Sequence, residues 1–371
     1  MKRLASLLLV AGCAASPETI APPPSPEAAV ASEVGSLRNA TVAIPRAEPK
    51  SRLVYFADSL SADELAAARA AAPGVEIVTG LTREQALARA AEAHAIDGLY
   101  ATSEFLAAAP NLVWVQAQSA GVDRYLRVKS LVESERIVLT NMRGVHGPAI
   151  ADHVFAMLLA LTRDLPVHIA ARANGRWLRE GSGNLVPIAL EGRTLCVVGL
   201  GGIGTEVAQR AHGFGMRVIA TRRSNDPGPD FVAKLGHAQD LHAFLAESDV
   251  VVVCVPLTSE TERMFDAAAF DALKPGAFLV NISRGRVVDT DALVGALRSK
   301  RLAGACLDVT DPEPLPEAHA LWAFPNVLIT PHVASEAELT RERAATLMRE
   351  NLRRFDAGEP LLNVVDKRAG Y

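Results

Sequence analysis

The sequence predicts an α/β protein with two doubly wound parallel sheets. Short apolar runs that suit buried strands alternate with Ala-rich stretches of helical spacing along most of the 371 residues, and such alternation is typical of parallel sheets covered on both faces. One apolar run, residues 195–198, breaks directly into a glycine-rich turn. A hydrophobic content of 49% in a chain of this length is sufficient for two cores.

The first 50 residues predict a targeting segment followed by a linker. Lys2 and Arg3 precede a short apolar stretch that ends in Val-Ala-Gly-Cys at Cys13, and residues 21–26 are Pro-rich. This layout resembles a secretion signal with a lipoprotein cleavage box, and its apolar stretch is too short to span a bilayer. We therefore expect a lipid anchor at Cys13 and a membrane-tethered lipoprotein on the outer, periplasmic side of the inner membrane. Because no twin-arginine signal is present, a cytoplasmic protein with a misassigned start codon is the alternative.

The folded part begins near Arg52 with a first series of strands and helices. Helical spacing predicts helices over 63–72 and 83–94, and Pro148 starts a long apolar helix over 149–161 that leads into the second series. The strands expected in this first series are 53–56, 75–78, 98–100, 112–115 and 137–139.

The second series predicts a doubly wound dinucleotide-binding domain, since it contains six strand-like runs interleaved with helices. A last helix over 338–356 is long enough to cross back onto the first domain. We therefore expect a signal and linker (1–50), a discontinuous domain (51–148 plus 335–371) and a second domain (149–334). The strands expected in the second domain are 195–198, 217–220, 250–255, 277–282, 305–309 and 327–329.

The glycine-rich turn at 199–204 fits the pattern G-x-G-x-x-G of the Rossmann fold. Gly199 permits the tight turn, Gly201 lets a pyrophosphate approach the backbone, and Gly204 lets the following helix pack on the strand. Gly202 and Ile203 complete the turn, whose amides and helix dipole would face the phosphates. A dinucleotide cofactor is the predicted ligand, and a plain turn is the alternative.

The end of the next strand favours NADP(H) over NAD(H). An acidic residue at this position would accept the ribose 2′-hydroxyl of NAD, but here the strand ends in Thr221-Arg222-Arg223-Ser224. Arginines pair bidentately with phosphate oxygens and would suit a 2′-phosphate. A solvated basic turn is the alternative, and NAD(H) stays possible.

Three polar residues follow strands of the second domain at the edge where such sheets bind ligands. They are Arg284, Glu313 and His332. Arginine can bind the carboxylate of a 2-oxo acid in a fork, and histidine can protonate the alkoxide that hydride transfer creates. A carboxylate on the second ring nitrogen would orient the imidazole. Together the three residues predict reduction of a 2-oxo acid.

From about residue 110 to 335 the chain resembles the D-isomer-specific 2-hydroxyacid dehydrogenase family. The segments that carry the resemblance are Ser-Ala-Gly-Val-Asp at 119–123, then 143–147, 151–153, 255–258 with Thr261, 281–285, 307–314 and 330–334. The resemblance implies a flavodoxin-like substrate domain, a Rossmann cofactor domain and a homodimer. The strand end at 221–224 is similar to the glyoxylate and hydroxypyruvate reductase branch, which uses NADPH.

The resemblance also implies roles for individual residues. Arg284, Glu313 and His332 would be the catalytic residues, and Ala120 and Gly121 would offer backbone amides to the substrate carboxylate. Asp123 is expected to cap a helix rather than to act in catalysis. The remaining cofactor-binding residues would be Pro256 and Thr261 along the adenine and ribose half, Ile282, and Asp308 on the nicotinamide side.

Composition argues against several other functions. The net charge of −4 gives no sign of a nucleic-acid partner, and the spacing of the four cysteines predicts no metal site. The predicted function is therefore an NADPH-linked oxidoreductase that converts a small 2-oxo acid into the D-2-hydroxy acid. The alternatives are a cofactor-bound sensor or scaffold without turnover, and a tethered envelope protein that keeps the fold alone.

Overall fold

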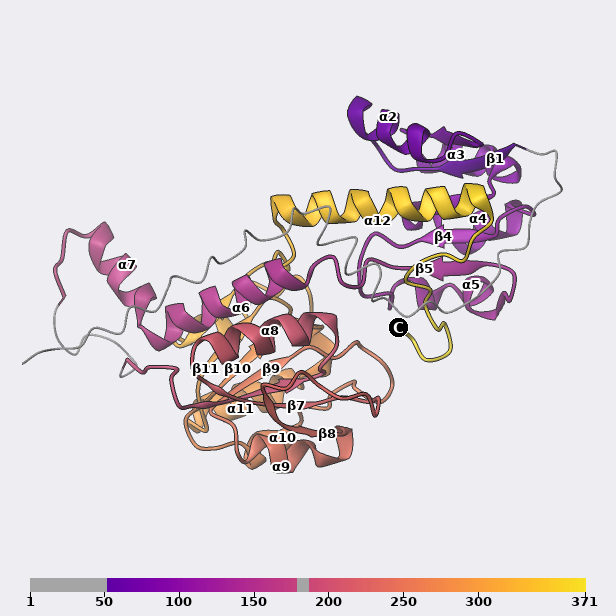
Figure 1. Ribbon diagram of the computed structural model, residues 1–371. Helices are drawn as coiled ribbons and strands as arrows, with labels where there is room; N and C mark the ends of the chain where they lie inside the picture. Colours follow the sequence, from indigo (N-terminus) through magenta and orange to yellow (C-terminus); the bar gives the residue numbers. More distant parts are fainter. Residues whose placement is uncertain (1–51, 179–186) are drawn as a thin grey trace, which may run out of the picture.

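The computed structural model describes residues 52–178 and 187–371, which form two domains with one parallel sheet each (Figure 1). The predicted fold class is confirmed, since every strand pair is parallel and helices cover both faces of each sheet. The predicted signal, the Cys13 anchor and the Pro-rich linker lie outside the described residues. Among the described helices, none alone is long and apolar enough to cross a membrane; α6 and α7 pass that test only as a pair bent by 73°.

The first domain contains five strands in the order β2-β1-β3-β4-β5, which is the flavodoxin-like order. Helices α2 and α12 cover one face, where the ring of Trp114 lies 5.4 Å from that of Tyr55 and 5.2 Å from that of Phe355. Helices α3, α4 and α5 cover the other face. The bounds are β1 Leu53–Phe56, α2 Ala62–Ala71, β2 Val75–Val78, α3 Arg83–Ala88, β3 Ala95–Asp97, α4 Ser103–Ala108, β4 Trp114–Gln116, α5 Lys129–Glu133, β5 Val138–Thr140 and α12 Glu338–Ala357.

One expected strand of the first domain is wrong. Residues Gly98–Tyr100 form a short 3₁₀ turn, and the strand is the preceding segment, β3. The error comes from Asp97, a charged residue that ends the strand although it is only 1% exposed. Its burial is possible because both carboxylate oxygens accept hydrogen bonds, as described below.

The second domain contains seven strands in the order β12-β11-β10-β9-β6-β7-β8. The strands β6 to β11 lie in the order β8-β7-β6-β9-β10-β11, which is the Rossmann arrangement. Helices α6 and α8 cover one face of the sheet, and α9, α10 and α11 cover the other. The bounds are α6 Gly147–Thr162, α7 Leu165–Ala173, β6 Thr194–Val198, α8 Gly202–Gly213, β7 Arg217–Thr221, β8 Val232–Gly236, α9 Leu241–Leu245, β9 Val250–Val253, α10 Ala267–Ala272, β10 Ala277–Asn281, α11 Thr290–Arg298, β11 Leu302–Leu307 and β12 Val327–Ile329.

Strand β8 is absent from the six expected strands. It lies at the edge of the sheet beside β7, and none of its five side chains is buried. An edge strand with a lysine and little apolar burial gives no continuous hydrophobic run, which is why the sequence pattern does not reveal it.

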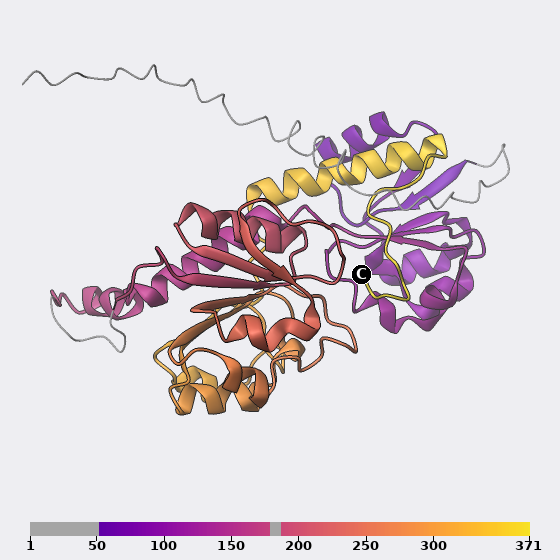
Figure 2. The same cartoon turned by 60° about the horizontal axis from the view of Figure 1, so that its bottom comes forward.

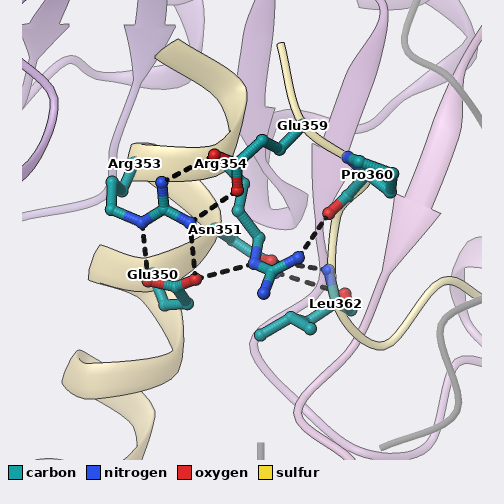
Figure 3. A network of polar contacts seen from close by, with 7 residues as sticks. All are labelled: Glu350, Asn351, Arg353, Arg354, Glu359, Pro360 and Leu362. Carbon is teal, nitrogen blue, oxygen red and sulfur yellow. Dashed lines mark hydrogen bonds and ion pairs between the residues drawn. The ribbon is translucent and has the colours of Figure 1, made fainter. Parts of the chain in front are cut away.

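Two helices connect the domains. The first, α6, leads out of the first domain and packs along α8, and α12 returns from the second domain to lie across the first sheet (Figure 1). A polar network then reverses the chain after α12: Glu350 binds both Arg353 and Arg354, and Glu359 binds Arg353 at 2.6 Å (Figure 3). The hydrogen bonds from Arg353 lower the pKa of both glutamates.

The segment after α12 passes back along the first sheet and ends between the domains (Figure 2). Buried Asn351 holds it by accepting a hydrogen bond from the Leu362 amide at 2.8 Å, and Val365 donates to the Leu139 carbonyl beside β5. At its end, the ring of Tyr371 lies against the guanidinium of Arg223, a residue of the second domain, at 4.0 Å. The C-terminal segment therefore contacts both domains.

Candidate active site

The glycine turn after β6 has the geometry that a dinucleotide requires. Gly199 adopts φ +102°, a conformation that other residues rarely tolerate. A Cβ on Gly204 would lie 2.2 Å from the Gly199 carbonyl oxygen, so only glycine lets α8 pack this closely on the turn. A Cβ on Gly201 would meet nothing within 4 Å.

These observations fit the predicted cofactor. The open space above Gly201, which precedes the first residue of α8, allows a phosphate to approach the backbone. Gly202 is exposed and Ile203 half-buried at the same helix N-terminus, where free amides and the positive end of the helix dipole favour an anion. The residues present would therefore hold the pyrophosphate of a dinucleotide.

The predicted 2′-phosphate residues lie at the end of β7 and in the turn after it, and they differ in how they are held. Thr221 is buried, and its carbonyl accepts hydrogen bonds from Gly199 and Leu200, which ties this strand end to the glycine turn. Arg222 donates to the Asp226 and Pro227 carbonyls, and its guanidinium lies 3.7 Å from the Asp226 carboxylate. Arg223 is exposed and stacks on Tyr371, and Ser224 is exposed beside it.

The other predicted cofactor residues are placed less uniformly. The Thr261 hydroxyl donates to the Pro256 carbonyl at 2.6 Å, so the two residues brace a single turn after β9. Ile282 is 7% exposed and packs in the core between the sheet and helices α6 and α8. Neither Ile282 nor Asp308 is among the described residues that line the main pocket.

The carboxyl ends of both sheets border a pocket of about 640 Å³ that contains all three predicted catalytic residues. The first domain contributes Gln118, Ser119, Gly121, Asp123, Arg124 and Arg127. The second domain contributes chiefly Leu257, Arg284, Arg286, Thr310, Glu313 and His332. Sequence spacing predicted that strand ends of the second domain converge on one crevice; the structure places Arg284, Glu313 and His332 in one pocket and adds residues of the first domain to its lining.

His332 and Glu313 form a direct pair in this pocket. The His332 Nδ1 lies 2.8 Å from the Glu313 Oε1, and both side chains are a little over two-fifths exposed. Because a carboxylate only accepts, this contact places a proton on Nδ1 and leaves Nε2 for a ligand. His332 has φ +58°, which costs a non-glycine residue of order 1 kcal/mol or more and needs support from its surroundings.

Asp308 supplies that support. Its Oδ1 accepts hydrogen bonds from the Thr330 hydroxyl (2.6 Å) and the Val333 amide, and its Oδ2 accepts from the Ala334 amide. Its carbonyl accepts from the His332 amide at 2.8 Å. Asp308 therefore fixes the loop that carries the histidine, and its carboxylate is directed into that loop rather than lining the pocket.

Arg284 is positioned by residues of both domains. Asn281, at the end of β10, donates to the Arg284 carbonyl, and Asp123 of the first domain accepts from the Arg284 Nε at 3.0 Å. The expectation that Asp123 caps a helix is therefore wrong: its carboxylate binds the guanidinium. A Cβ on Gly121 would lie 1.9 Å from the Arg284 Nη2, so a larger residue at this position would displace the guanidinium where the two domains meet.

The two predicted substrate-loop residues differ. Gly121 lines the pocket, whereas Ala120 does not, and the Ala120 carbonyl accepts a hydrogen bond from Asn141 at 2.9 Å. The loop is thus anchored on one side by Asn141 and borders the Arg284 guanidinium on the other.

A buried carboxylate lies behind the pocket wall. Asp97 accepts hydrogen bonds from the Tyr55 hydroxyl (2.5 Å), the Asp58 amide (2.6 Å) and the side chain of pocket residue Gln118. Burial raises the pKa of the Asp97 carboxyl to about 6, although these hydrogen bonds act in the opposite direction. Burial likewise raises the pKa of Tyr55.

Sequence reasoning missed several residues of this site. Asp97 ends a strand and Gln118 follows another, so position at a strand end was an available signal for both. Arg124 and Arg127 follow the Ser-Ala-Gly-Val-Asp segment but belong to an irregular turn. Their approach to the pocket depends on the packing of two domains and left no mark in the sequence pattern.

Comparisons with known proteins agree with this geometry. The model of the D-isomer specific 2-hydroxyacid dehydrogenase NAD-binding domain matches residues 155–334. A glyoxylate reductase from Thermococcus litoralis is 37% identical over 276 residues, covering 71% of this chain and 80% of that protein. A D-isomer specific 2-hydroxyacid dehydrogenase from Xanthobacter autotrophicus, solved with NADPH and MES, has a TM-score of 0.71 at 33% identity and covers 86% of this chain and 100% of that one. The NADPH-dependent glyoxylate/hydroxypyruvate reductase of Sinorhizobium meliloti, in complex with NADP and sulfate, has a TM-score of 0.70 at 28% identity, with coverage of 86% and 100%.

Proposed function

The chain belongs to the D-isomer-specific 2-hydroxyacid dehydrogenase family, and from this premise we propose that it reduces a small 2-oxo acid to the D-2-hydroxy acid with NADPH. Glyoxylate and hydroxypyruvate are the first candidates, because relatives carry these names. The observation that carries the proposal is the single pocket that contains Arg284 and the His332–Glu313 pair.

Each residue has a task in this reaction. Arg284 would bind the substrate carboxylate through its guanidinium, beside the backbone of Gly121. The nicotinamide, when bound, supplies the hydride. His332, protonated at both nitrogens, would donate its Nε2 proton to the carbonyl oxygen of the substrate as that oxygen becomes an alkoxide. Glu313 would hold the ring through Nδ1 and stabilise the imidazolium before the transfer.

The preference for NADPH is the finer part of the proposal. It is supported by the basic strand end at Arg222 and Arg223, where the chain offers guanidiniums in place of the acid that would bind a free ribose hydroxyl. The neighbours from Xanthobacter and Sinorhizobium were solved with NADPH or NADP. NAD(H) stays the alternative cofactor.

A spectrophotometric assay of the full chain tests both parts. Glyoxylate or hydroxypyruvate is mixed with NADPH or with NADH, and the loss of absorbance at 340 nm is followed. We expect turnover with NADPH, a higher KM for NADH, and D-glycerate rather than L-glycerate from hydroxypyruvate. A sensor or scaffold without turnover would bind the cofactor and leave the absorbance unchanged, although such a protein has no need for Arg284, Glu313 and His332 together.

A homodimer is a further proposal, and exposed apolar side chains support it. Leu165 and Ile169 of α7 are 43% and 64% exposed, and Trp177 beyond it is 92% exposed. Figure 1 draws α7 projecting from the second domain. Exposed apolar side chains of this size are typical of interaction surfaces. Light scattering should give a dimer that Ile169→Asp converts to a monomer; a monomeric parent protein would contradict the proposal.

The lipid anchor at Cys13 and the periplasmic location also stay proposals, supported by the cleavage-box pattern. We expect the protein in the membrane fraction and a Cys13→Ser variant in the soluble fraction. Recovery of the parent protein in the cytoplasmic fraction would favour the misassigned start codon instead.

A further inference from the structure

We propose that the preferred substrate is a 2-oxo acid with a second anionic group, a carboxylate or a phosphate, and that Arg124 and Arg127 bind that group. This inference rests on the proposed 2-oxo acid reduction and names the substrate class of the same pocket. It departs from glyoxylate and hydroxypyruvate, whose single carboxylate would engage Arg284 alone.

The charges that line the pocket are the first argument. Four arginines border it, and two of them already have carboxylate partners: Arg284 binds Asp123 at 3.0 Å, and Arg286 binds Glu262 at 2.5 Å. Arg124 and Arg127 have no carboxylate partner within residues 52–178 and 187–371. A guanidinium that borders a pocket and has no carboxylate partner of its own is available to an anionic ligand.

The orientation of Arg124 is the second argument. Its guanidinium lies over the ring of Tyr125 at 4.5 Å, and its Nη2 donates to the Tyr125 hydroxyl. Tyr125 is only 2% exposed, so it is a fixed support rather than a surface side chain. An arginine held by stacking loses less conformational freedom when it binds an anion than a free one would.

The competing charges within the pocket do not cancel this pair. Glu313 is bound to His332 and Asp123 to Arg284, which leaves the half-buried Asp311 as the remaining carboxylate of the lining. Arg124 and Arg127 stand against that single acid, so the first-domain side of the pocket keeps an excess of positive charge. An anionic tail on the substrate would neutralise it.

The position of the two arginines agrees with this substrate class. Arg124 follows Asp123 directly and precedes the 3₁₀ segment Tyr125–Arg127, which Arg127 ends. Both arginines line the pocket that contains Arg284, so a substrate whose 2-carboxylate lies on Arg284 can direct its other end toward them.

Matched substrate pairs test the proposal with the full chain. Oxaloacetate is compared with 2-oxobutyrate, 2-oxoglutarate with 2-oxopentanoate, and phosphohydroxypyruvate with hydroxypyruvate, all at fixed saturating NADPH. We expect kcat/KM to be about tenfold or more higher for the acid with the anionic tail in at least one pair, which is the worth of one charge-assisted hydrogen bond. The first two pairs report a carboxylate and the third reports a phosphate.

Variants then locate the effect. Arg124→Ala and Arg127→Ala should each raise KM for the anionic acid about tenfold or more and leave kcat/KM for its uncharged partner within a factor of two. Arg124→Lys and Arg127→Lys should restore part of the preference because they keep the charge. Arg83→Ala, an exposed arginine of the same domain outside the pocket, serves as the matched control and should change neither value.

Three outcomes would overturn the proposal. Equal kcat/KM values within every pair would contradict a preference for a second anionic group, although the proposed reduction of 2-oxo acids would stand. A rise in KM for NADPH rather than for the anionic acids would assign the two arginines to the cofactor. Failure to reduce any of the six acids would defeat this proposal and the proposed function together, which distinguishes it from the first outcome.

Discussion

Gly121→Ala should disable substrate binding without harming the fold. The methyl group would lie 1.9 Å from the Arg284 Nη2 and 2.8 Å from its Cζ, whereas carbon contacts are optimal at about 3.5–4.0 Å. The guanidinium must therefore retreat by roughly 1.5 Å or more. Gly121 does not have a positive φ, so alanine causes no backbone strain there. The side chain of Arg284 is part-exposed and has room to move.

The magnitude follows from that displacement. A misplacement of about 1 Å at a reacting centre can cost about 10²-fold, so we expect kcat/KM for the 2-oxo acid to fall about 100-fold, or by about 2.7 kcal/mol of transition-state stabilisation. The loss should appear mainly in KM, because we propose that Arg284 binds the carboxylate of the substrate. KM for NADPH should be unchanged, since Gly121 belongs to the first domain and the glycine turn to the second. Steady-state kinetics with each substrate varied in turn measures these values.

Gly295→Ala is the matched control. Gly295 lies inside α11, and a Cβ there would meet nothing within 4 Å, so alanine should stabilise that helix by about 0.5–1 kcal/mol without affecting kinetics. Thermal unfolding of both variants checks that the fold persists. If Gly121→Ala kept kcat/KM within twofold of the parent, the contact between Gly121 and Arg284 would have no catalytic importance, and the assignment of Arg284 as the carboxylate-binding residue would fail.

Three further predictions concern charged groups. His332→Gln should lower kcat by about 10²-fold or more, as loss of a general acid does, and Glu313→Gln should lower it in the same direction; a near-normal kcat for His332→Gln in steady-state assays would refute the acid assignment. Arg223→Ala should raise KM for NADPH and leave KM for NADH unchanged. Arg222→Ala also removes the contact between the guanidinium and Asp226 within the turn, so it should weaken the binding of both cofactors. Equal losses with both cofactors for Arg223→Ala would refute a contact with the 2′-phosphate. Burial raises the pKa of Asp97 to about 6 in the folded state, from an ordinary 3.8, so the stabilisation from its protonated form is complete below about pH 4 and is lost as the pH rises through 6. In urea unfolding, the free energy of unfolding of the parent relative to Asp97→Asn should therefore fall by up to about 3 kcal/mol between pH 4 and 6. A difference that does not depend on pH would contradict the raised pKa.

The fold was predictable wherever burial was uniform. Strands such as β6 and β9, buried on both faces, appear in the sequence as continuous apolar runs, and Gly199 with Gly204 marked the turn whose geometry only glycine allows. Prediction failed where burial and polarity disagreed. Strand β3 ends in a buried carboxylate, and β8 is an edge strand with no buried side chain, so neither presents the pattern of a core strand.

The candidate site divides in the same way. Arg284 follows β10 by three residues and His332 follows β12 by three, so parallel strand order places both at one edge of the sheet, and their spacing was informative. The prediction that Asp123 caps a helix was wrong because its partner, Arg284, lies 161 residues away in the other domain. No local pattern encodes a contact of that separation.

The reaction and the choice of substrate therefore depend on different parts of the chain. His332, the proposed proton donor, and the glycine turn both lie at strand ends of one sheet. The carboxylate of Asp308 accepts three hydrogen bonds in the loop of His332. Arg124 and Arg127 lie on a short turn of the other domain, without ion-pair partners in its described residues. Because additivity holds for sites that share no partners, substitutions on that turn should change which acid is reduced while the hydride-transfer machinery stays intact. The ratio of kcat/KM values between the matched acids is thus the quantity that isolates specificity from catalysis in this enzyme.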